Sequence, residues 1–350
     1  MTQAAARPLA SAWTEAKEAD PFARARDVAA RLGVSEGALA EARRGAGVMR
    51  LRGEGEALSR LVTALPRLGR VMTLTRNDAA VHETKGRAGE TAGMGAIGQV
   101  TGEIDLRLFY RCWRAAYEVA EETRSGLRRS IQIFDGAGDS ILKIFALEGA
   151  DTDAWARLVR AEADPDAPPL TYMPAEPEAG DRPDAEIDLE ALRAGWRALD
   201  HSHDFHGLLR RTGAGREQAL RLAGPEFARP AGPEAARRML EAAAGHVPIM
   251  CFAGNPGCIQ IFSGEVNKIK MMGPWLNVLD EAFNLHLRTD LVASTWLVTK
   301  PTKQRGPITS LELFDARGRL ACQFFGVRPA GGVEREDWRR IAHAAAEGAA

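Results

Sequence analysis

Three of the chain's seven histidines lie within six positions, in the stretch "LDHSHDFHGLL" at residues 199–209. They are His201, His203 and His206. Imidazole changes charge near neutral pH and is the commonest metal ligand. A cluster of this kind can bind zinc, bind a haem iron, act as a general base, or lie on a solvated helix face.

The spacing of these histidines favours some of these roles over others. If residues 196–210 form one helix, His203 and His206 share a face that also carries Trp196, while His201 points elsewhere. A zinc site built on one helix needs its histidines on one face, with four-residue spacing preferred. The sequence does not provide that for all three, so zinc is the weaker alternative. A solvated face with hydrogen-bonded histidines remains open.

The chain consists of two similar halves. Residues 161–186 are rich in proline and acidic residues, which predicts an exposed linker between an N-terminal repeat, 1–160, and a C-terminal repeat, 187–350. The stretch at 71–86 aligns without a gap with the stretch at 249–264. An internal match of this length indicates duplication of a unit of about 150 residues.

Further matches extend the repeat. Residues 130–147 align with residues 310–327. Near the start of each half, Trp13 corresponds to Trp196 and Phe22 to Phe205, which on the same register places His203 opposite Asp20.

The order of periodic segments predicts the fold class. In each half, helical spacing comes first and short alternating segments follow. Strands in runs, joined by hairpins and flanked by helices, predict an α+β fold with large antiparallel sheets, and two such halves are expected to be related by a pseudo-twofold axis. The expected helices are 22–44, 187–222 and 334–347, and the expected strands of the first half are 70–75, 79–84, 104–109, 130–135 and 140–147.

A duplicated chain offers an internal control, because features that both halves share belong to the fold. Features in one half only are candidates for function. The histidine cluster occurs in the second half only. Three other positions also differ in chemical type: His82 stands opposite Gln260, Arg107 opposite His286, and Lys300 opposite Glu121.

Composition narrows the class of protein. The 350 residues carry a formal net charge of -1, so no overall positive field attracts nucleic acid or anionic lipid. The N-terminus has no apolar core of a secretory signal, and no apolar run is long enough to span a membrane. The four scattered cysteines form no CxxC pair. We therefore expect a cytoplasmic protein with reduced thiols.

A second motif suggests DNA binding. Residues 25–45 have the pattern of a helix-turn-helix. However, the second helix begins at Glu36 and also presents Glu41, and carboxylates are poor partners for phosphate. We therefore favour a structural helical hairpin and expect no nucleic acid partner. His82 and Glu83 are adjacent on an expected strand. They are weak candidates for a general base and its acidic partner, because neighbours on a strand point to opposite faces.

Five motifs together resemble the hemin-degrading factor family, the cytoplasmic haem-handling proteins of bacterial haem uptake. The resemblance covers nearly the whole chain. Its motifs are "TRNDAAVHETKG" (75–86), "GEIDLRLF" (102–109), "WRALDHSHDFHGLL" (196–209), "GPWLNVLDEAFNLHLR" (273–288) and "VTKPTKQRGPITSLELFD" (298–315).

The resemblance implies one haem b between two similar halves. It makes His203 the axial ligand of the haem iron and Arg107 the arginine on the opposite side, where it would act on iron-bound oxygen. It places Lys300 near a propionate and Phe252 and Gln323 in the lining of the pocket. The sequence departs from the family pattern at His206, where phenylalanine is usual, so His206 is a second candidate ligand.

Elementary chemistry agrees with these implied roles. An iron ligand needs a neutral imidazole on a rigid mount, and propionates need fixed cations. Lys300 precedes Pro301, which favours an extended, outward-pointing backbone. The apolar stretch 271–283 is expected either to wall the porphyrin or to pack in the core, especially at Met271 and Met272.

Two haem functions remain open at this point. One is a haem-degrading, oxygenase-like enzyme with an external electron donor, in which Arg107 polarises bound oxygen. The other is a chaperone that delivers haem to a separate haem oxygenase, with His201 and His206 as spare ligands. The expected partners are haem, a haem ABC importer, and an oxygenase or reductase.

Overall fold

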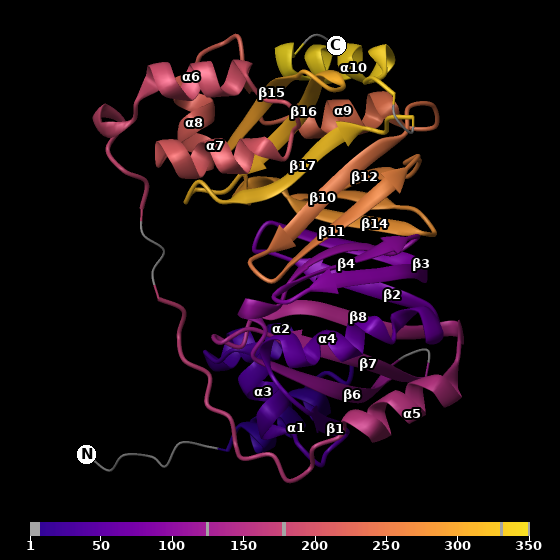
Figure 1. Ribbon diagram of the computed structural model, residues 1–350. Helices are drawn as coiled ribbons and strands as arrows, with labels where there is room; N and C mark the ends of the chain where they lie inside the picture. The colour runs from indigo at the N-terminus through magenta and orange to yellow at the C-terminus, as the bar shows by residue number, and fades with distance from the viewer. Residues whose placement is uncertain (1–7, 124–125, 177–179, 330–331, 349–350) are drawn as a thin grey trace. The chain divides into compact units, whose positions relative to one another are not determined.

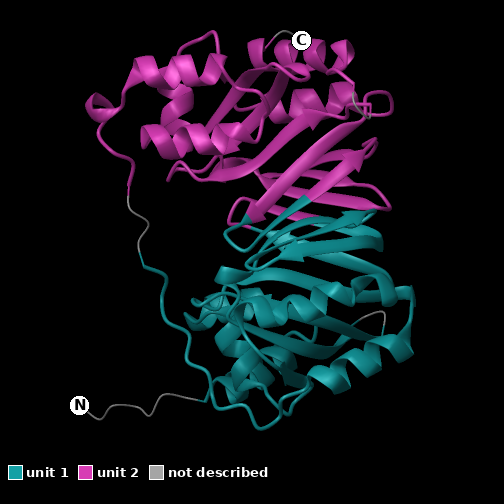
Figure 2. Cartoon of the chain, viewed as in Figure 1, with its two compact units in different colours: residues 1–76, 83–176, 255–260 teal, residues 77–82, 177–254, 261–350 magenta. Residues whose placement is uncertain are grey.

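The computed structural model describes residues 8–123, 126–176, 180–329 and 332–348, which form two compact units (Figure 2). Two short segments are exchanged: 77–82 belongs to unit 2, and 255–260 belongs to unit 1. Unit 1 comprises residues 1–76, 83–176 and 255–260, and unit 2 comprises residues 77–82, 177–254 and 261–350.

Unit 1 combines short helices with long strands (Figure 1). Its helices are α1 (Leu9–Ala19), α2 (Ala25–Leu32), α3 (Glu36–Ala42), α4 (Ser59–Thr63) and α5 (Thr152–Glu162), with 3-10 turns at Gly55–Leu58, Leu65–Arg67 and Tyr110–Cys112. Its strands are β1 (Val48–Leu51), β2 (Gly69–Arg76), β3 (Ala80–Met94, which begins in unit 2), β4 (Ile97–Gly102), β5 (Asp105–Phe109), β6 (Ala115–Thr123), β7 (Gly126–Phe134) and β8 (Ser140–Ala150).

Unit 2 repeats this plan. Its helices are α6 (Leu189–Arg197), α7 (Asp204–Thr212), α8 (Arg216–Ala223), α9 (Ala235–Ala243) and α10 (Glu336–Glu347), with 3-10 turns at Asp184–Glu186 and Thr289–Leu291. Its strands are β9 (Ala228–Ala231), β10 (Ile249–Asn255), β11 (Cys258–Gly264, which begins in unit 1), β12 (Ile269–Met272), β13 (Trp275–Leu279), β14 (Phe283–Arg288), β15 (Ser294–Thr302), β16 (Gly306–Phe314) and β17 (Leu320–Gly326).

The strand pairings establish the internal repeat. The main sheet of unit 1 has the order β1-β6-β7-β8-β2, and that of unit 2 has the order β9-β15-β16-β17-β10. Every one of these pairs is antiparallel. The predicted α+β class with antiparallel sheets is therefore confirmed. The pseudo-twofold axis and the boundaries at 160 and 187 stay predictions.

In unit 2 the main sheet is covered on both faces, as Figure 1 shows. Leu297, Leu311 and Phe324 face α9 and α10 and are buried with them in one core. Val298 and Phe314 face the other way and are buried with α6, α7 and α8. Because side chains alternate along a strand, the same strands that build the α9–α10 core also present a second face to α7 and α8.

The predicted helical hairpin in the first half is present as α2 and α3. Ser35 caps α3 by accepting a hydrogen bond from the backbone N–H of Ala38 at 3.2 Å. The start of α3 is buried: Glu36 forms an ion pair with Lys143 of β8, and the backbone N–H of Gly37 donates to the carbonyl of Gly138 at 2.8 Å. The helix that would enter a DNA groove is used for packing.

The Phe22–Phe205 correspondence is wrong. Gly33 ends α2 and Gly213 ends α7, both in the left-handed conformation with φ of 66° and 68°, and these caps align the two helices. Phe22 is exposed before α2, whereas Phe205 is buried inside α7. On the register of the caps, His203 stands opposite Ala23.

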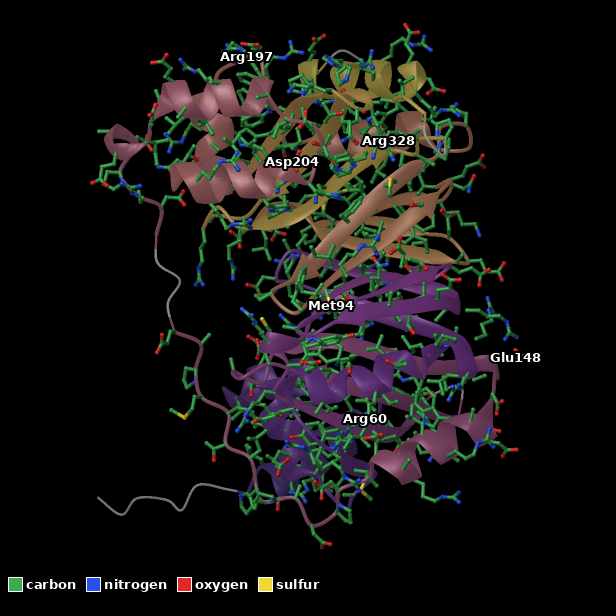
Figure 3. All side chains as sticks on the ribbon, in the orientation of Figure 1. Arg60, Met94, Glu148, Arg197, Asp204 and Arg328 are labelled. Carbon is green, nitrogen blue, oxygen red and sulfur yellow. The ribbon has the colours of Figure 1, made fainter. Side chains whose placement is uncertain are left out.

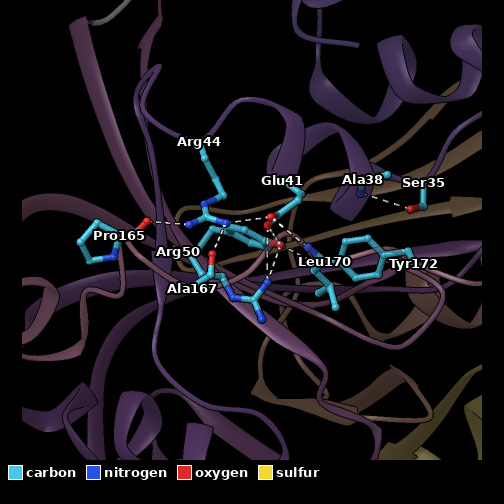
Figure 4. Close-up of polar contacts among 10 residues, drawn as sticks. Ser35, Ala38, Glu41, Arg44, Arg50, Pro165, Ala167, Leu170 and Tyr172 are labelled. Carbon is cyan, nitrogen blue, oxygen red and sulfur yellow. Dashed lines mark hydrogen bonds and ion pairs between the residues drawn. The ribbon is translucent and has the colours of Figure 1, made fainter. Parts of the chain in front are cut away.

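The proline-rich segment between the halves is tied to unit 1 (Figure 4). Arg44 donates to the backbone carbonyls of Pro165 at 2.7 Å and Ala167 at 2.8 Å. The hydroxyl groups of Tyr172 and Tyr117 are 2.9 Å apart, and Tyr117 also donates to Glu41 at 2.7 Å. Most side chains of the segment are exposed, as composition predicts, yet its backbone is held in place.

Removing the Tyr172 hydroxyl should weaken this attachment. We expect Tyr172→Phe to lower the free energy of unfolding of unit 1 by about 1 kcal/mol, because one part-buried hydrogen bond is lost. Urea denaturation followed by tryptophan fluorescence measures the change. Met173 is exposed, so Met173→Ala is the matched control. Equal effects of the two variants would show that the hydroxyl contributes nothing.

Among the described residues, no helix is both long and apolar enough to cross a membrane.

Candidate functional site

The histidine cluster lies in a turn and not in one helix, so the predicted continuous helix over 196–210 is wrong. Helix α6 ends at Arg197 and α7 begins at Asp204. The carbonyl of Leu199 accepts a hydrogen bond from the backbone N–H of Lys303 at 3.1 Å, and the carbonyl of Asp200 accepts one from the N–H of Gln304 at 3.3 Å. Since these carbonyls are bound by the β15–β16 turn, they do not continue the helix.

His203 is the residue immediately before α7, and its side chain is exposed. The ring of His201 lies against it, with ring centroids 4.5 Å apart. The backbone N–H of His203 donates to Nδ1 of His201 at 3.3 Å, and Asp204 accepts from the backbone N–H of His201 at 2.8 Å. The expectation that His201 points away from His203 is therefore wrong.

Phe205 fixes the start of α7. Its side chain is 1% exposed, and its ring packs edge-on against Trp196 with centroids 4.5 Å apart. Trp196 in turn donates its indole N–H to the carbonyl of Thr299 at 3.0 Å. Because Phe205 is buried, its neighbours His203 and His206 are exposed on a rigid mount.

The packing of the protein around the ring of His206 lowers the pKa of this histidine, and the cations Arg216 and Lys300 lower it further, against the opposing carboxylate of Glu312. His206 is therefore neutral at pH 7 and able to bind a metal through a ring nitrogen.

Three of the predicted site residues share one face of the unit 2 sheet. Glu312 is paired with Gln323, and Gln323 with Phe252. Lys300 lies four positions after Trp296, which is paired with Glu312. The structure thus brings Lys300, Gln323 and Phe252 together on the face that α7 and α8 cover, opposite to the α9–α10 core.

A buried ion network occupies this face. Glu312 accepts from Nζ of Lys300 at 2.8 Å, from Nε of Arg216 at 2.8 Å and from the Ser310 hydroxyl at 3.0 Å. Arg216, from the first turn of α8, also donates from Nη2 to the side-chain oxygen of Gln323 at 3.2 Å. Two cations and one carboxylate leave the network with one net positive charge.

Lys300 is buried within this network. Its backbone is extended in β15 as expected, its side chain is only 3% exposed, and Nζ lies 4.9 Å from the ring centroid of Phe205. Complete burial would raise the pKa of the Glu312 carboxyl, yet Arg216 and Lys300 more than offset this and hold that pKa below its ordinary value. Glu312 is therefore ionised and paired with Lys300.

Arg328 is a further cation of unit 2, and one of its guanidinium nitrogens has no hydrogen-bond partner among the described residues. It follows β17, and Figure 3 labels it together with Asp204 of α7. Its Nη1 atom is buried and has no hydrogen-bond partner among the described residues. Burial lowers the pKa of Arg328, and nearby Arg305 lowers it further. A buried guanidinium nitrogen without an acceptor suits an anionic group of a ligand.

Arg107 lies on β5 of unit 1, so it belongs to a different unit from the histidines. It forms an ion pair with Asp105 and donates to the carbonyl of Leu106 at 3.1 Å. At the equivalent place in unit 2, Nδ1 of His286 lies 2.7 Å from Oδ1 of Asn277. The place of Arg107 opposite His203 stays a prediction.

The apolar stretch at 271–283 does not behave as a uniform wall. Met271 and Met272 are 41% and 53% exposed on β12. Their exposure shows that core packing is wrong for these two side chains, whereas a contact with the porphyrin stays a prediction. A separate hollow of about 460 Å³ lies between α6, α7 and residues 182–188, and none of the predicted site residues lines it.

Unit 1 has the same scaffold with different chemistry. In the strand register, Gln132 of unit 1 corresponds to Glu312 of unit 2, and Lys143 corresponds to Gln323. Glu36, the first residue of α3, corresponds to Arg216, the first residue of α8. The predictions from sequence did not include Arg216, Glu312 or Arg328 among the site residues. The comparison of halves that marked the histidine cluster would also have marked Arg216 and Glu312.

No three His, Cys, Asp or Glu side chains converge to hold a metal ion in the part of the chain that the structure describes. The geometry thus gives no support to the zinc alternative. An exposed imidazole beside buried cations fits instead a ligand that brings its own metal coordination and its own anionic groups.

Comparisons with known proteins agree with this arrangement. The hemin transport protein HmuS of Yersinia pestis is 38% identical over 333 residues, covering 93% of this chain and 94% of that protein. The solved structure of holo-PhuS, a heme-binding protein from Pseudomonas aeruginosa, has a TM-score of 0.91 at 44% identity and covers 97% of this chain and 99% of its own. ChuS, the heme degrading enzyme of Escherichia coli O157:H7, has a TM-score of 0.86 at 34% identity, with 96% of this chain and 98% of its own covered.

A family model described as the haemin-degrading HemS.ChuX domain matches the chain twice, at residues 33–161 and 213–344. The two matches confirm the internal duplication and together cover more than half of the chain. The chain belongs to the haemin-degrading HemS/ChuX family.

Proposed function

We propose that the protein binds one haem at unit 2, with His203 as the axial ligand of the iron. The observation that carries this proposal is the exposed His203 at the start of α7, fixed by buried Phe205 beside a cationic network. The equivalent place in unit 1 has neither the histidines nor the same network. The haem-binding and hemin transport relatives support haem as the molecule that is bound.

The residues present suit the chemical parts of haem. The iron needs a neutral imidazole, and the two propionates need cations. The candidates in unit 2 are Arg216, which is paired with Glu312, and Arg328, whose Nη1 is buried without a hydrogen-bond partner among the described residues. Phe252 packs edge-on against Phe325, with centroids 5.2 Å apart, and offers apolar surface to the porphyrin. Haem itself supplies the iron coordination and the redox chemistry.

We favour haem trafficking in the cytoplasm, with delivery to a separate haem oxygenase, as the first function. The contact between the rings of His201 and His203, with His206 one helical turn further, offers alternative ligands during transfer. Ring opening is the second candidate, supported by Arg107 and by ChuS, described as an E. coli heme oxygenase, at 32% identity. A haem ABC importer and a reductase are the corresponding protein partners.

Hemin titration of the purified protein tests the ligand. We expect a red-shifted Soret band in the wild type, and in His203→Ala a changed spectrum and about tenfold weaker affinity, because one metal–ligand bond is lost. His246 is exposed and lies after α9, outside the site, so His246→Ala is the matched control. An unchanged spectrum and affinity in His203→Ala would exclude His203 as the ligand.

A second measurement separates the two functions. Reductant is added to the haem complex in the presence of catalase, and bilin, free iron and carbon monoxide are measured. Trafficking predicts intact haem that moves to an added haem oxygenase. Formation of bilin and carbon monoxide, lost in Arg107→Ala, would favour degradation.

A further inference from the structure

Glu312 lies at the centre of the cationic network and is 0% exposed. Both of its oxygens are engaged, one by Lys300 and Ser310 and the other by Arg216. A carboxylate in this position satisfies the same cations that an anionic ligand would need. Any ligand carboxylate that approaches Arg216 therefore meets a cation that is already paired.

The members of the network differ in access to the surface. Lys300 is 3% exposed and lies beneath Phe205, whereas the Arg216 side chain is 16% exposed. Nζ of Lys300 and Cζ of Arg216 lie 4.9 and 5.4 Å from the ring centroid of Phe205, the residue directly before His206, which places the network beside the histidine cluster. An anion near the histidines thus senses the summed charge of Lys300, Glu312 and Arg216, and reaches Arg216 before Lys300.

The scaffold does not require a carboxylate at this position. In unit 1 the equivalent residue is Gln132, which pairs with β6 and β8 in the same register as Glu312 pairs with β15 and β17. The side-chain amide of Gln132 donates to the Ser130 hydroxyl at 3.0 Å. In unit 2 the same pair of positions is joined in the opposite direction, because the Ser310 hydroxyl donates to Glu312. A neutral side chain of the same length therefore fits the fold.

We propose that Glu312 is a built-in competitor for the carboxylate of the ligand. It keeps Lys300 and Arg216 paired when no ligand is bound, limits the network to one net positive charge, and so weakens the hold on an anionic ligand that must be released again. This inference rests on the proposed haem binding. The proposal for Glu312 adds one claim about specificity. The protein's preference for a porphyrin that carries carboxylates depends on the net charge of Lys300, Glu312 and Arg216 together, and not on Lys300 alone.

The test compares hemin with hemin dimethyl ester, which has the same ring and iron but no carboxylates. The measured quantity is the affinity for hemin divided by the affinity for the dimethyl ester. It is measured in the wild type, in two single variants and in the double variant. Relative to the wild type, we expect Glu312→Gln to raise the ratio about tenfold, because the network gains one positive charge, and Lys300→Met to lower it about tenfold. The double variant Glu312→Gln/Lys300→Met restores the original net charge and is expected to restore the ratio.

Ser310→Ala removes a hydroxyl that donates to Glu312 without changing any charge, and is the matched control. If Glu312→Gln folds poorly because two buried cations lack a partner, Lys300→Met and the double variant still decide the matter. A ratio that stays constant across the variants, while His203-dependent binding of hemin persists, would overturn the role of Glu312 alone. Absence of His203-dependent hemin binding in the wild type would overturn the proposed function as well.

Discussion

Replacement of Asn77 by alanine is expected to lower the free energy of unfolding by about 3 kcal/mol, because the side chain makes four hydrogen bonds that no neighbouring group can replace. Its amide donates to the carbonyls of Gly254 at 2.9 Å and Ala321 at 2.8 Å. Its oxygen accepts from the backbone N–H groups of Ala79 at 3.0 Å and Ala80 at 2.8 Å. All five residues belong to unit 2.

The internal repeat supplies the parallel variant. Asn255 makes the same four bonds in unit 1, to the carbonyls of Arg76 and Ile141 and from the N–H groups of Gly257 and Cys258. Asn255→Ala should therefore destabilise unit 1 to a similar extent. Each asparagine joins an exchanged segment, 77–82 or 255–260, to the unit that contains it.

Urea denaturation at neutral pH measures both effects. Asn267 is exposed, and Asn267→Ala is the control, with an expected change within about 0.5 kcal/mol. A loss below about 1 kcal/mol in both Asn77→Ala and Asn255→Ala would contradict the role assigned to these side chains.

Acidification from pH 7 to pH 5 is expected to destabilise the wild type by about 2 kcal/mol more than His82→Gln. Complete burial of His82 lowers its pKa from 6.5 to about 3, although its Nε2–H donates to the carbonyl of Cys251 at 3.3 Å. Below pH 6.5 the unfolded chain binds a proton at this position and the folded chain does not. The stability contributed by the neutral ring is therefore present above pH 6.5 and is lost as the pH falls towards 3.

Glutamine is the appropriate replacement because the other unit already uses it. Gln260 is buried and donates to the carbonyl of Thr73 at 3.0 Å, and Thr73 is the repeat counterpart of Cys251. Urea midpoints of the two proteins at several pH values give the comparison. Gln260→His should introduce the same acid sensitivity into unit 1. Parallel pH profiles of the wild type and His82→Gln would show that His82 is already protonated in the folded state.

The repeat was predictable because equivalent residues occur in the same order along the two halves of the sequence. Alternation of apolar residues placed β2, β5 and β8 within three residues of their bounds, but it ended β3 ten residues before Met94 and did not predict β1, β4 or β6. The gapless match of 71–86 with 249–264 indicated equivalent strands before any pairing was known. The same comparison marked the histidine cluster as foreign to the common scaffold. Resemblance to a known family then selected His203 from three candidates.

Helix boundaries near the cluster were not predictable from periodicity. The apolar spacing continues through 196–210, but the carbonyls of Leu199 and Asp200 are bound by the turn at Lys303 and Gln304. A hydrogen bond from residues a hundred positions away leaves no trace in local spacing. For the same reason His201, expected to point away, packs against His203.

The sequence by itself determined the class of fold and its duplication, because these depend on local periodicity and on residue type. The choice of His203 as the iron ligand came from the family resemblance and stays a prediction. The tertiary structure alone decided which charges are paired. It buried Lys300 against Glu312, brought Arg216 from α8 to the same carboxylate, and left Nη1 of Arg328 without a partner among the described residues. Pairing depends on distances of a few ångströms between residues far apart in the chain, since Coulomb energy and hydrogen bonding act through space and not along the sequence.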